Sequence, residues 1–205
     1  MNPVHIASLV EGYGEVEALP VLLRRVVGEI SPSITQVIPP AWRHPAGSIQ
    51  KLGGLERALS AVAERYPGHS IVVLMDCDDD CPKELGPKMT QRVKQGRPDL
   101  YISFVLAHRE YESWFLAAAE SIAGKSNLNL DLVAPENLEN IRDAKGWLSR
   151  HIRGSGRYSP TQDQAALSHL FQFARARTRS RSFQKFWKEI EAIVRIAEGL
   201  VASPA

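Results

Sequence analysis

Cysteine is scarce in this chain: among 205 residues only Cys77 and Cys81 are present, and they lie close together. With two cysteines, a zinc site made of four thiolates cannot be completed. No apolar run approaches the roughly 20 residues that a membrane-spanning helix needs. The first residues contain neither a cationic stretch nor a small-residue cleavage signal. These absences predict a reduced, soluble, cytoplasmic protein that does not enter a membrane.

Several common ligand-binding motifs are also missing. There is no GxxxxGK[ST] loop, and the two glycines at residues 12–14 lack the third glycine of a dinucleotide-binding fingerprint. Asp76, Asp78 and Asp80 have the spacing that opens an EF-hand calcium loop. That loop needs glycine where this chain has Cys81, so the calcium interpretation fails. The Asp-x-Asp-x-Thr motif of haloacid-dehalogenase phosphatases is matched poorly, which leaves that class as a weak alternative.

The composition is typical of a globular protein, but the charge is unevenly distributed. Hydrophobic residues make up 44% and charged residues 23%, close to the average for soluble proteins. Residues 1–141 contain 13 Lys and Arg against 18 Asp and Glu, a net charge of −5. Residues 142–205 contain 12 against 5, a net charge of +7. This division predicts a cation site in the first part and a polyanion contact in the second.

The first half of the chain alternates between strand and helix patterns. Short apolar runs predict strands over 4–10, 34–38, 71–75 and 101–106. Helical spacing between them predicts helices over 15–27, 52–66 and 82–94. Because strands and helices alternate, we expect an α/β fold, with a parallel sheet of about four strands flanked by helices.

The second half has helical patterns alone. They cover 112–122 and continue from about residue 136. We therefore expect an α/β core of residues 1–122, followed by a helical, basic extension of residues 123–205 packed on the core.

Acidic side chains follow two of the predicted strands. Glu11 follows the first strand, and Asp76 and Asp78 follow the third. Ligands bind beyond the carboxyl ends of the strands in an open parallel sheet. If the chain stays extended, Asp76 and Asp78 lie on one side and Cys77 on the other. Because hard divalent cations prefer carboxylate oxygens, the pattern predicts a metal site. A solvated turn after a buried strand is the plain alternative.

Two segments resemble the Toprim domain of topoisomerases, primases and the overcoming-lysogenization-defect nucleases. They are VEGYGEVEAL at 10–19 and VVLMDCDD at 72–79. A strand ending in Val-Glu-Gly, then a helix, and a later strand ending in Asp-x-Asp have the order and spacing of that domain over residues 1–110. The resemblance implies a Toprim-like fold and metal-dependent chemistry on phosphodiesters.

A wider resemblance, to the bacterial domain-of-unknown-function family 4276, covers nearly the entire chain. It rests on the segment EYESWF at 110–115 and on a late pattern that contains Tyr158, Asp163 and residues 179–183. That family is assigned to the Toprim-like group and often accompanies ATPases in defence-type gene neighbourhoods. It often has a lysine two residues after the late tyrosine, where this chain has Pro160. The resemblance therefore implies no role for a lysine at this position of the chain.

The resemblance also implies roles for individual residues. Glu11 would be a metal ligand or general acid/base, and Asp76 and Asp78 would be metal ligands, so that these three are the catalytic residues. Glu15 and Glu112 would complete a second metal position, with Mg²⁺ or Mn²⁺ as the cofactor. Two cations of this kind can activate water and stabilise the leaving oxygen in phosphodiester cleavage.

The resulting functional prediction is a Mg²⁺- or Mn²⁺-dependent nuclease in phage defence or DNA processing, with DNA as its substrate and an ATPase as a partner. Arg175, Arg177, Arg179 and Arg181 would contact phosphates, although a solvated helical face explains them equally well. Tyr158 would stack on a base or anchor a loop. The alternatives are a non-catalytic module that binds nucleic acid or an ATPase, and a small-molecule phosphohydrolase. The sequence leaves open DNA against RNA and whether the chain forms a homo-oligomer.

Overall fold

The fold is built on a parallel five-stranded sheet, in a computed structural model that describes residues 2–45, 47–49, 51 and 53–201. Its strands are β1 (Val4–Val10), β2 (Gln36–Val37), β3 (Trp42–Arg43), β4 (Ser70–Asp76) and β5 (Ile102–Ala107). The order is β2-β1-β4-β5, and β3 pairs with the later part of β1. The predicted α/β fold with a parallel sheet is confirmed. The two-residue strand β3 was not predicted, because so short a segment has no detectable periodicity.

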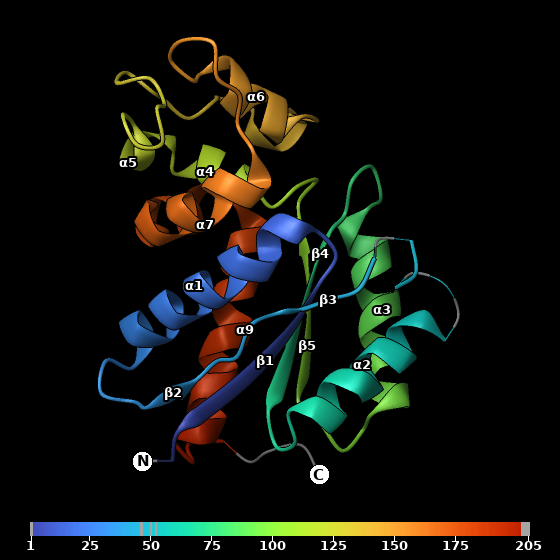
Figure 1. Cartoon of the computed structure of the whole chain (residues 1–205). Coiled ribbons are helices and arrows are strands. Elements are labelled where there is room, and N and C mark those ends of the chain that lie inside the picture. Colours follow the sequence, from blue (N-terminus) through green and yellow to red (C-terminus); the bar gives the residue numbers. More distant parts are fainter. Residues whose placement is uncertain (1, 46, 50, 52, 202–205) are drawn as a thin grey trace.

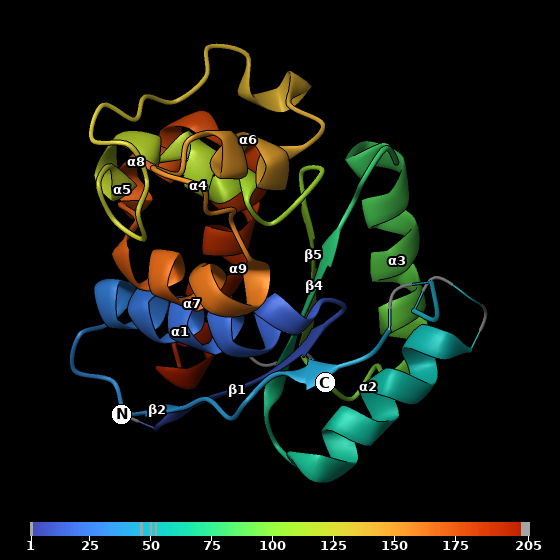
Figure 2. The same cartoon turned by 45° about the horizontal axis from the view of Figure 1, so that its top comes forward.

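Helices cover both faces of this sheet. The described residues form α1 (Tyr13–Ile30), α2 (Gly54–Arg65), α3 (Pro82–Gly96), α4 (Ser113–Ala117), α5 (Ala119–Ile122), α6 (Ala144–Arg150), α7 (Pro160–Leu170), α8 (Phe173–Arg179) and α9 (Arg181–Ala197). Helices α2 and α3 lie on one face, and α1 and α9 on the other (Figures 1 and 2). The predicted helix over 52–66 is α2, except that Leu52 lies outside the described residues.

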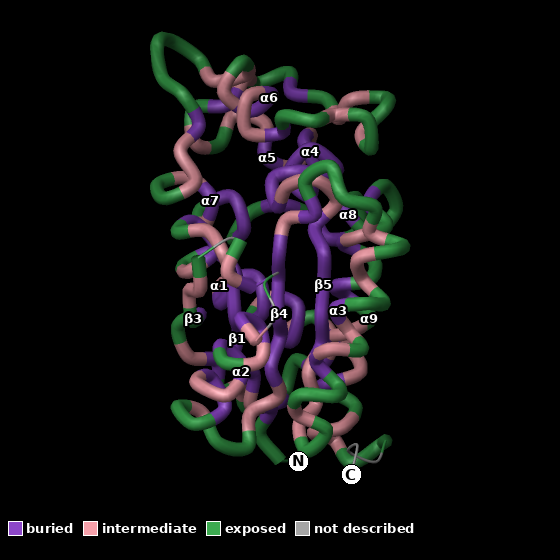
Figure 3. The backbone as a smooth tube through the Cα atoms, turned by 90° about the vertical axis from the view of Figure 1, so that its right-hand side faces the viewer, coloured by how far each residue is buried: buried purple, intermediate pink, exposed green. Residues whose placement is uncertain are grey.

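Alternate side chains of the strands fill two separate hydrophobic cores. Leu9 and Val73 pack with α2 and α3, whereas Ile6 and Val105 pack with α1 and α9. This follows from the two-residue period of a strand. Because both faces of the sheet are covered, β1, β4 and β5 are buried along most of their length (Figure 3). In β4 the sequence is continuously apolar over 71–75 instead of alternating.

The helices after residue 123 take part in one of these cores. Helix α7 packs along α1, and α9 packs on β5 and β1. Phe183 and Phe186 of α9 lie 5.3 Å and 5.2 Å, between ring centroids, from Trp114 of α4. One apolar cluster thus contains side chains from both sides of the boundary predicted at residue 122. The boundary itself stays a prediction.

The single helix predicted over 112–122 is interrupted at Ala118. This residue has φ −120° and ψ 25°, which separates α4 from α5. The side chain of Ser121 donates a 2.5 Å hydrogen bond to the carbonyl of Ala118. A serine that bonds nearby backbone in this way competes with the regular helical pattern.

No helix in the described part of the chain is both long and apolar enough to cross a membrane.

Candidate functional site

A pocket of about 460 Å³ opens where β1 and β4 end. Its walls include four acidic side chains and one lysine: Glu11, Glu15, Asp76, Asp78 and Lys145. Helices α4 to α6 lie above this end of the sheet (Figure 1). A larger hollow of about 720 Å³, between α3 and α9, has mostly apolar walls and no acidic group among the described residues that line it. The acidic pocket therefore lies at the carboxyl ends of the strands, where ligands bind in open parallel sheets.

Gly12 and Gly14 allow the segment after β1 to pack tightly against its surroundings. A Cβ atom at Gly12 would collide with the carboxylate of Glu15. A Cβ atom at Gly14 would collide with the side-chain oxygen of Gln164 and with Pro160 at the start of α7. The two glycines after Val10 thus allow close approach of backbone and side chains at this site, without forming a phosphate-binding loop.

Glu11 lies in a negatively charged environment. Burial raises its pKa, Asp78 and Glu15 raise it further, and the resulting pKa is about 7. A neighbouring anion disfavours ionisation, because the second negative charge must form close to the first. Without a cation, Glu11 therefore holds a proton to a much higher pH than an ordinary glutamate.

Asp76 and Asp78 line the same pocket, although the backbone between them is not fully extended. Strand β4 ends at Asp76, whose Oδ1 accepts a 2.8 Å hydrogen bond from the backbone of Tyr111. Asp78 has φ 46°, in the left-handed region, so the chain turns instead of staying extended. Cys77 is buried, and its sulfur accepts a 3.1 Å hydrogen bond from the backbone of Arg109. The extended conformation therefore ends after β4, whose pairing with β5 stops at Asp76 and Ala107, but Asp76 and Asp78 still share one pocket while Cys77 packs in the core with α2 and α3.

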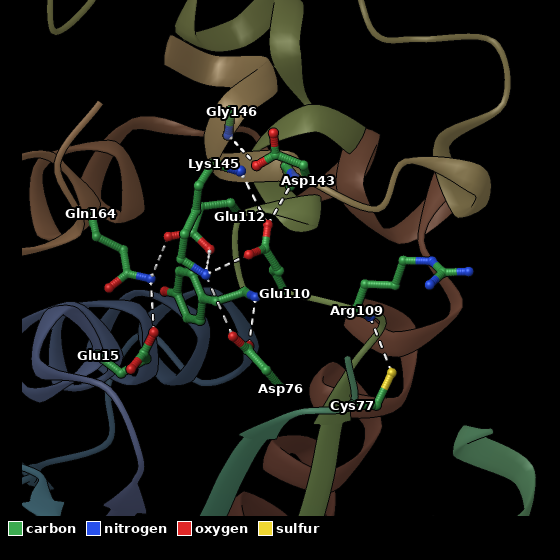
Figure 4. Close-up of polar contacts among 12 residues, drawn as sticks. Glu15, Asp76, Cys77, Arg109, Glu110, Glu112, Asp143, Lys145, Gly146 and Gln164 are labelled. Atoms are coloured by element: carbon green, nitrogen blue, oxygen red, sulfur yellow. Dashed lines mark hydrogen bonds and ion pairs between the residues drawn. The ribbon is translucent and has the colours of Figure 1, made fainter. Parts of the chain in front are cut away.

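Glu112 is fully buried next to the pocket and is held by residues from the second half of the chain. Its Oε1 accepts hydrogen bonds from the hydroxyl of Tyr158 (2.9 Å) and from Nε2 of Gln164 (3.2 Å). Gln164 also donates to Oε1 of Glu15, at 3.0 Å (Figure 4). Tyr158 is buried as well, so of the two roles predicted for it the structure favours the anchor over base stacking. Burial raises the pKa of Glu112 above its ordinary value.

Lys145 lies among three carboxylates. Its Nζ is 2.9 Å from Oε1 of Glu110, 3.1 Å from Oε2 of Glu112 and 3.6 Å from Oδ2 of Asp76 (Figure 4). The contact with Glu112 is an ion pair without hydrogen-bond geometry. Burial lowers the pKa of Lys145, but Glu112, Asp76 and Glu110 together raise it by more. The side chain is therefore a fixed positive charge in an otherwise acidic site.

The start of α6 places this lysine. The other oxygen of Glu110 accepts hydrogen bonds from the backbone of Ala144 (2.7 Å) and Lys145 (3.1 Å). Asp143 caps the helix by accepting a 2.6 Å hydrogen bond from the backbone of Gly146. Carboxylates at a helix N-terminus bind the free N–H groups there. The carboxylate of Glu110 thus holds the first turn of α6, and this position directs the side chain of Lys145 towards Asp76.

Sequence reasoning missed both Lys145 and Gln164. Lys145 and Pro160 line the same pocket, so a lysine reaches the site from α6, although the position where the family often carries one is occupied by proline. The pattern Asp143-Ala-Lys145-Gly, with its capping aspartate, is a signal for a helix start. It does not indicate that the lysine reaches the acids.

The four predicted nucleic-acid-binding arginines lie outside this pocket. Arg179 donates to both oxygens of Glu120 (2.8 and 2.7 Å), and Arg175 donates to Gln172 (2.9 Å). The guanidinium of Arg177 lies 4.3 Å from the ring centre of Trp187. Arg181, with 82% of its side chain exposed, is 4.0 Å from Glu139. The side chain of Arg181 is therefore more accessible to an external ligand than those of Arg175 and Arg179.

A polar groove lies beside three of these arginines, Arg177, Arg179 and Arg181. It has a volume of about 540 Å³ and lies between residues 136–140 and the junction of α8 with α9. Arg109 joins this groove to the pocket: it donates to the carbonyl of Glu139 (3.5 Å) and to the carboxylate of Asp79 (2.6 Å), which follows Asp78. The basic and acidic regions are thus neighbours on the molecule.

Within the described residues, no three His, Cys, Asp or Glu side chains form a group that is placed to hold a metal ion. Metal binding therefore stays a prediction for Glu11, Glu15, Asp76, Asp78 and Glu112.

The parallel sheet and its flanking helices define an α/β protein, with a pocket beyond the ends of β1 and β4. Residues 10–191 match the family described as Domain of unknown function (DUF4276), so the chain belongs to this family. No curated protein and no solved structure matches the chain.

Proposed function

We propose that this protein is a Toprim-like, metal-dependent phosphodiesterase that cleaves nucleic acid. The observation that carries the proposal is the meeting of Glu11, Glu15, Asp76 and Asp78 in one pocket at the ends of two parallel strands. The order of these acids along the chain, one after the first strand and the pair after β4, is the order that resembles the Toprim domain.

The donor set suits one Mg²⁺ or Mn²⁺. Both cations prefer carboxylate oxygens and retain several waters, so two or three protein ligands are enough. The ammonium of Lys145 compensates the negative charges of Asp76 and Glu112. Within the described residues, no Lys or Arg side chain forms an ion pair with Glu11 or Asp78. Burial raises the pKa of Glu11, and the charges of Asp78 and Glu15 raise it further, so this part of the pocket has an excess of negative charge. A divalent cation would relieve it, with Glu11, Asp76 and Asp78 as the residues that hold the ion.

A bound cation would polarise a phosphodiester and lower the pKa of a water molecule for attack. The protein side chains supply the rest. Glu11 is placed to ligate the ion or to take up a proton in the pocket. Asp76 is fixed by its bond from the Tyr111 backbone. Glu112, Gln164 and Tyr158 hold Lys145 and Glu15 in position without contacting a substrate.

Nucleic acid is the substrate class that the charge distribution supports best. A carboxylate pocket repels a polyanion, so a nuclease needs cationic surface nearby. The groove that contains Arg181 lies next to the acidic end, with Arg109 between them. The family resemblance extends the proposal to an ATPase partner and to a role in defence or DNA processing.

The test is a cleavage assay with plasmid, linear duplex, single-stranded DNA and RNA, in Mn²⁺, Mg²⁺ or EDTA. We expect cleavage of at least one substrate with Mn²⁺ and none with EDTA. Glu11→Gln and Asp76→Asn should lose at least 100-fold in rate, a typical loss when a group that stabilises transition-state charge is removed. Asp80→Asn is the matched control, because Asp80 is an exposed acid on the same loop that does not line the pocket.

Cleavage that survives in Glu11→Gln and Asp76→Asn would argue against the proposal. Hydrolysis of a small phosphoester with no cleavage of any nucleic acid would favour a phosphohydrolase. Nucleic-acid binding without cleavage, with or without an ATPase, would favour the non-catalytic module.

A further inference from the structure

Three carboxylate oxygens from separate side chains converge on one point, and that point is occupied by the Lys145 ammonium. They are Oε1 of Glu110 at 2.9 Å, Oε2 of Glu112 at 3.1 Å and Oδ2 of Asp76 at 3.6 Å. Hard divalent cations prefer carboxylate oxygens as ligands. Here the ammonium of Lys145 lies where such a cation would contact these oxygens.

The surroundings hold this arrangement firmly. Glu112 is fully buried, and its other oxygen is bonded to Tyr158 and Gln164. The second oxygen of Glu110 is bonded to two backbone N–H groups at the start of α6. Each carboxylate thus presents one oxygen to Lys145 while the other is engaged elsewhere. Breaking such a buried pair is costly, because it leaves an uncompensated charge.

We infer that the pocket takes one divalent cation, and that the Lys145 ammonium permanently occupies the second cation position. This inference rests on the proposed function. It replaces the two-metal arrangement, with Glu15 and Glu112 as the further ligands, that the family resemblance implied. Glu11, Asp76 and Asp78 hold the divalent cation. The ammonium of Lys145 compensates the negative charges of Glu110 and Glu112.

Two features of the site agree with this division. One oxygen of Glu15 is already engaged, since its Oε1 accepts a hydrogen bond from Gln164. A second divalent ion would also have to displace an ammonium that forms ion pairs with three carboxylates. Lys145 is therefore a positioning residue: it orients Asp76 and supplies fixed positive charge beside the metal-binding side of the pocket.

The experiment counts Mn²⁺ per chain by equilibrium dialysis and by calorimetric titration, without substrate. We expect one ion in the wild type and two in Lys145→Ala, because removing the ammonium opens a site with three carboxylate oxygens. Adding Glu112→Gln to Lys145→Ala should return the number to one. Lys125→Ala, which removes an exposed lysine, should bind one ion like the wild type.

Two ions in the wild type would overturn this inference but leave the proposed function standing. One ion in Lys145→Ala, with unchanged affinity, would overturn the role of Lys145. No ion in the wild type would remove the proposed metal site and this inference with it. If Lys145→Ala does not fold, the wild-type count still decides between one and two ions.

Discussion

Tyr158 donates a 2.9 Å hydrogen bond to Oε1 of Glu112, and both side chains are buried. The bond joins the loop before α7 to the segment after β5, so the helical second half of the chain fixes a carboxylate next to the strand ends. Gln164 on α7 makes a similar connection to Glu112 and to Glu15. The helices after residue 123 thus build part of the site as well as part of the core.

The first prediction concerns this bond. Tyr158→Phe removes one hydrogen bond to a charged, buried group, which should lower the free energy of unfolding by about 1.5–3 kcal/mol. Urea denaturation measures the change, and the m-value should stay the same. Tyr66→Phe, at a half-buried tyrosine packed with α2 and α3, is the control and should change stability by less than about 0.5 kcal/mol. Equal effects of the two changes would contradict a specific role for Tyr158.

The second prediction concerns two glycines in α1. Gly14→Ala should destabilise the protein by about 1–3 kcal/mol, because the added methyl group must push Gln164 and Pro160 away. Gly28→Ala in the same helix meets only one side-chain atom, at 3.6 Å, and should stabilise by up to about 1 kcal/mol. Thermal or urea unfolding of both variants checks the prediction. A stabilising Gly14→Ala would mean that α7 does not pack tightly against α1.

The third prediction is a pH dependence of the metal-free protein. Glu11 has a pKa of about 7 in the folded state against an ordinary value of 4.5. Between these values the folded protein holds a proton that the unfolded chain has released, so Glu11 lowers stability progressively as pH rises from about 4.5 to about 7. Glu11→Gln should therefore gain stability relative to the wild type across this interval, and the difference should level off above pH 7. Denaturation in EDTA at several pH values measures it; a constant difference would contradict the raised pKa.

The fourth prediction separates two arginines of the basic region. Arg181→Gln should reduce the slope of log affinity for duplex DNA against log salt by about 0.9, the contribution of one phosphate contact, with little change in stability. Arg179→Gln should mainly lower stability, since Arg179 is bonded to Glu120 and to the carbonyl of Ala117. Binding curves at several salt concentrations, measured in EDTA, check the slope. Urea denaturation checks the stability of both variants. An unchanged slope in Arg181→Gln would indicate that this groove does not hold nucleic acid.

Local sequence patterns predicted the parts of the site that come directly from strands. Glu11 and Asp76 could be placed because each follows an apolar run, and parallel strands bring their ends together. The turn at Asp78 could not be predicted, since it depends on where the pairing of β4 with β5 stops.

The contributions of Lys145 and Gln164 could not be predicted for a different reason. Both reach the site from helices whose packing is determined by the whole core, and no local pattern of charges marks a lysine that will lie among distant carboxylates. The α/β class follows from periodicity alone, whereas the charge balance of the site requires the tertiary structure.

The most direct test of the central claim is the effect of Mn²⁺ on thermal unfolding, since it requires no substrate. A ligand that binds only the folded state raises its melting temperature. We predict a saturable increase with millimolar Mn²⁺ in the wild type and in Asp80→Asn. The increase should be absent in Glu11→Gln and in the double variant Asp76→Asn/Asp78→Asn. No increase in the wild type, or an equal increase in the double variant, would contradict a metal site at the ends of β1 and β4.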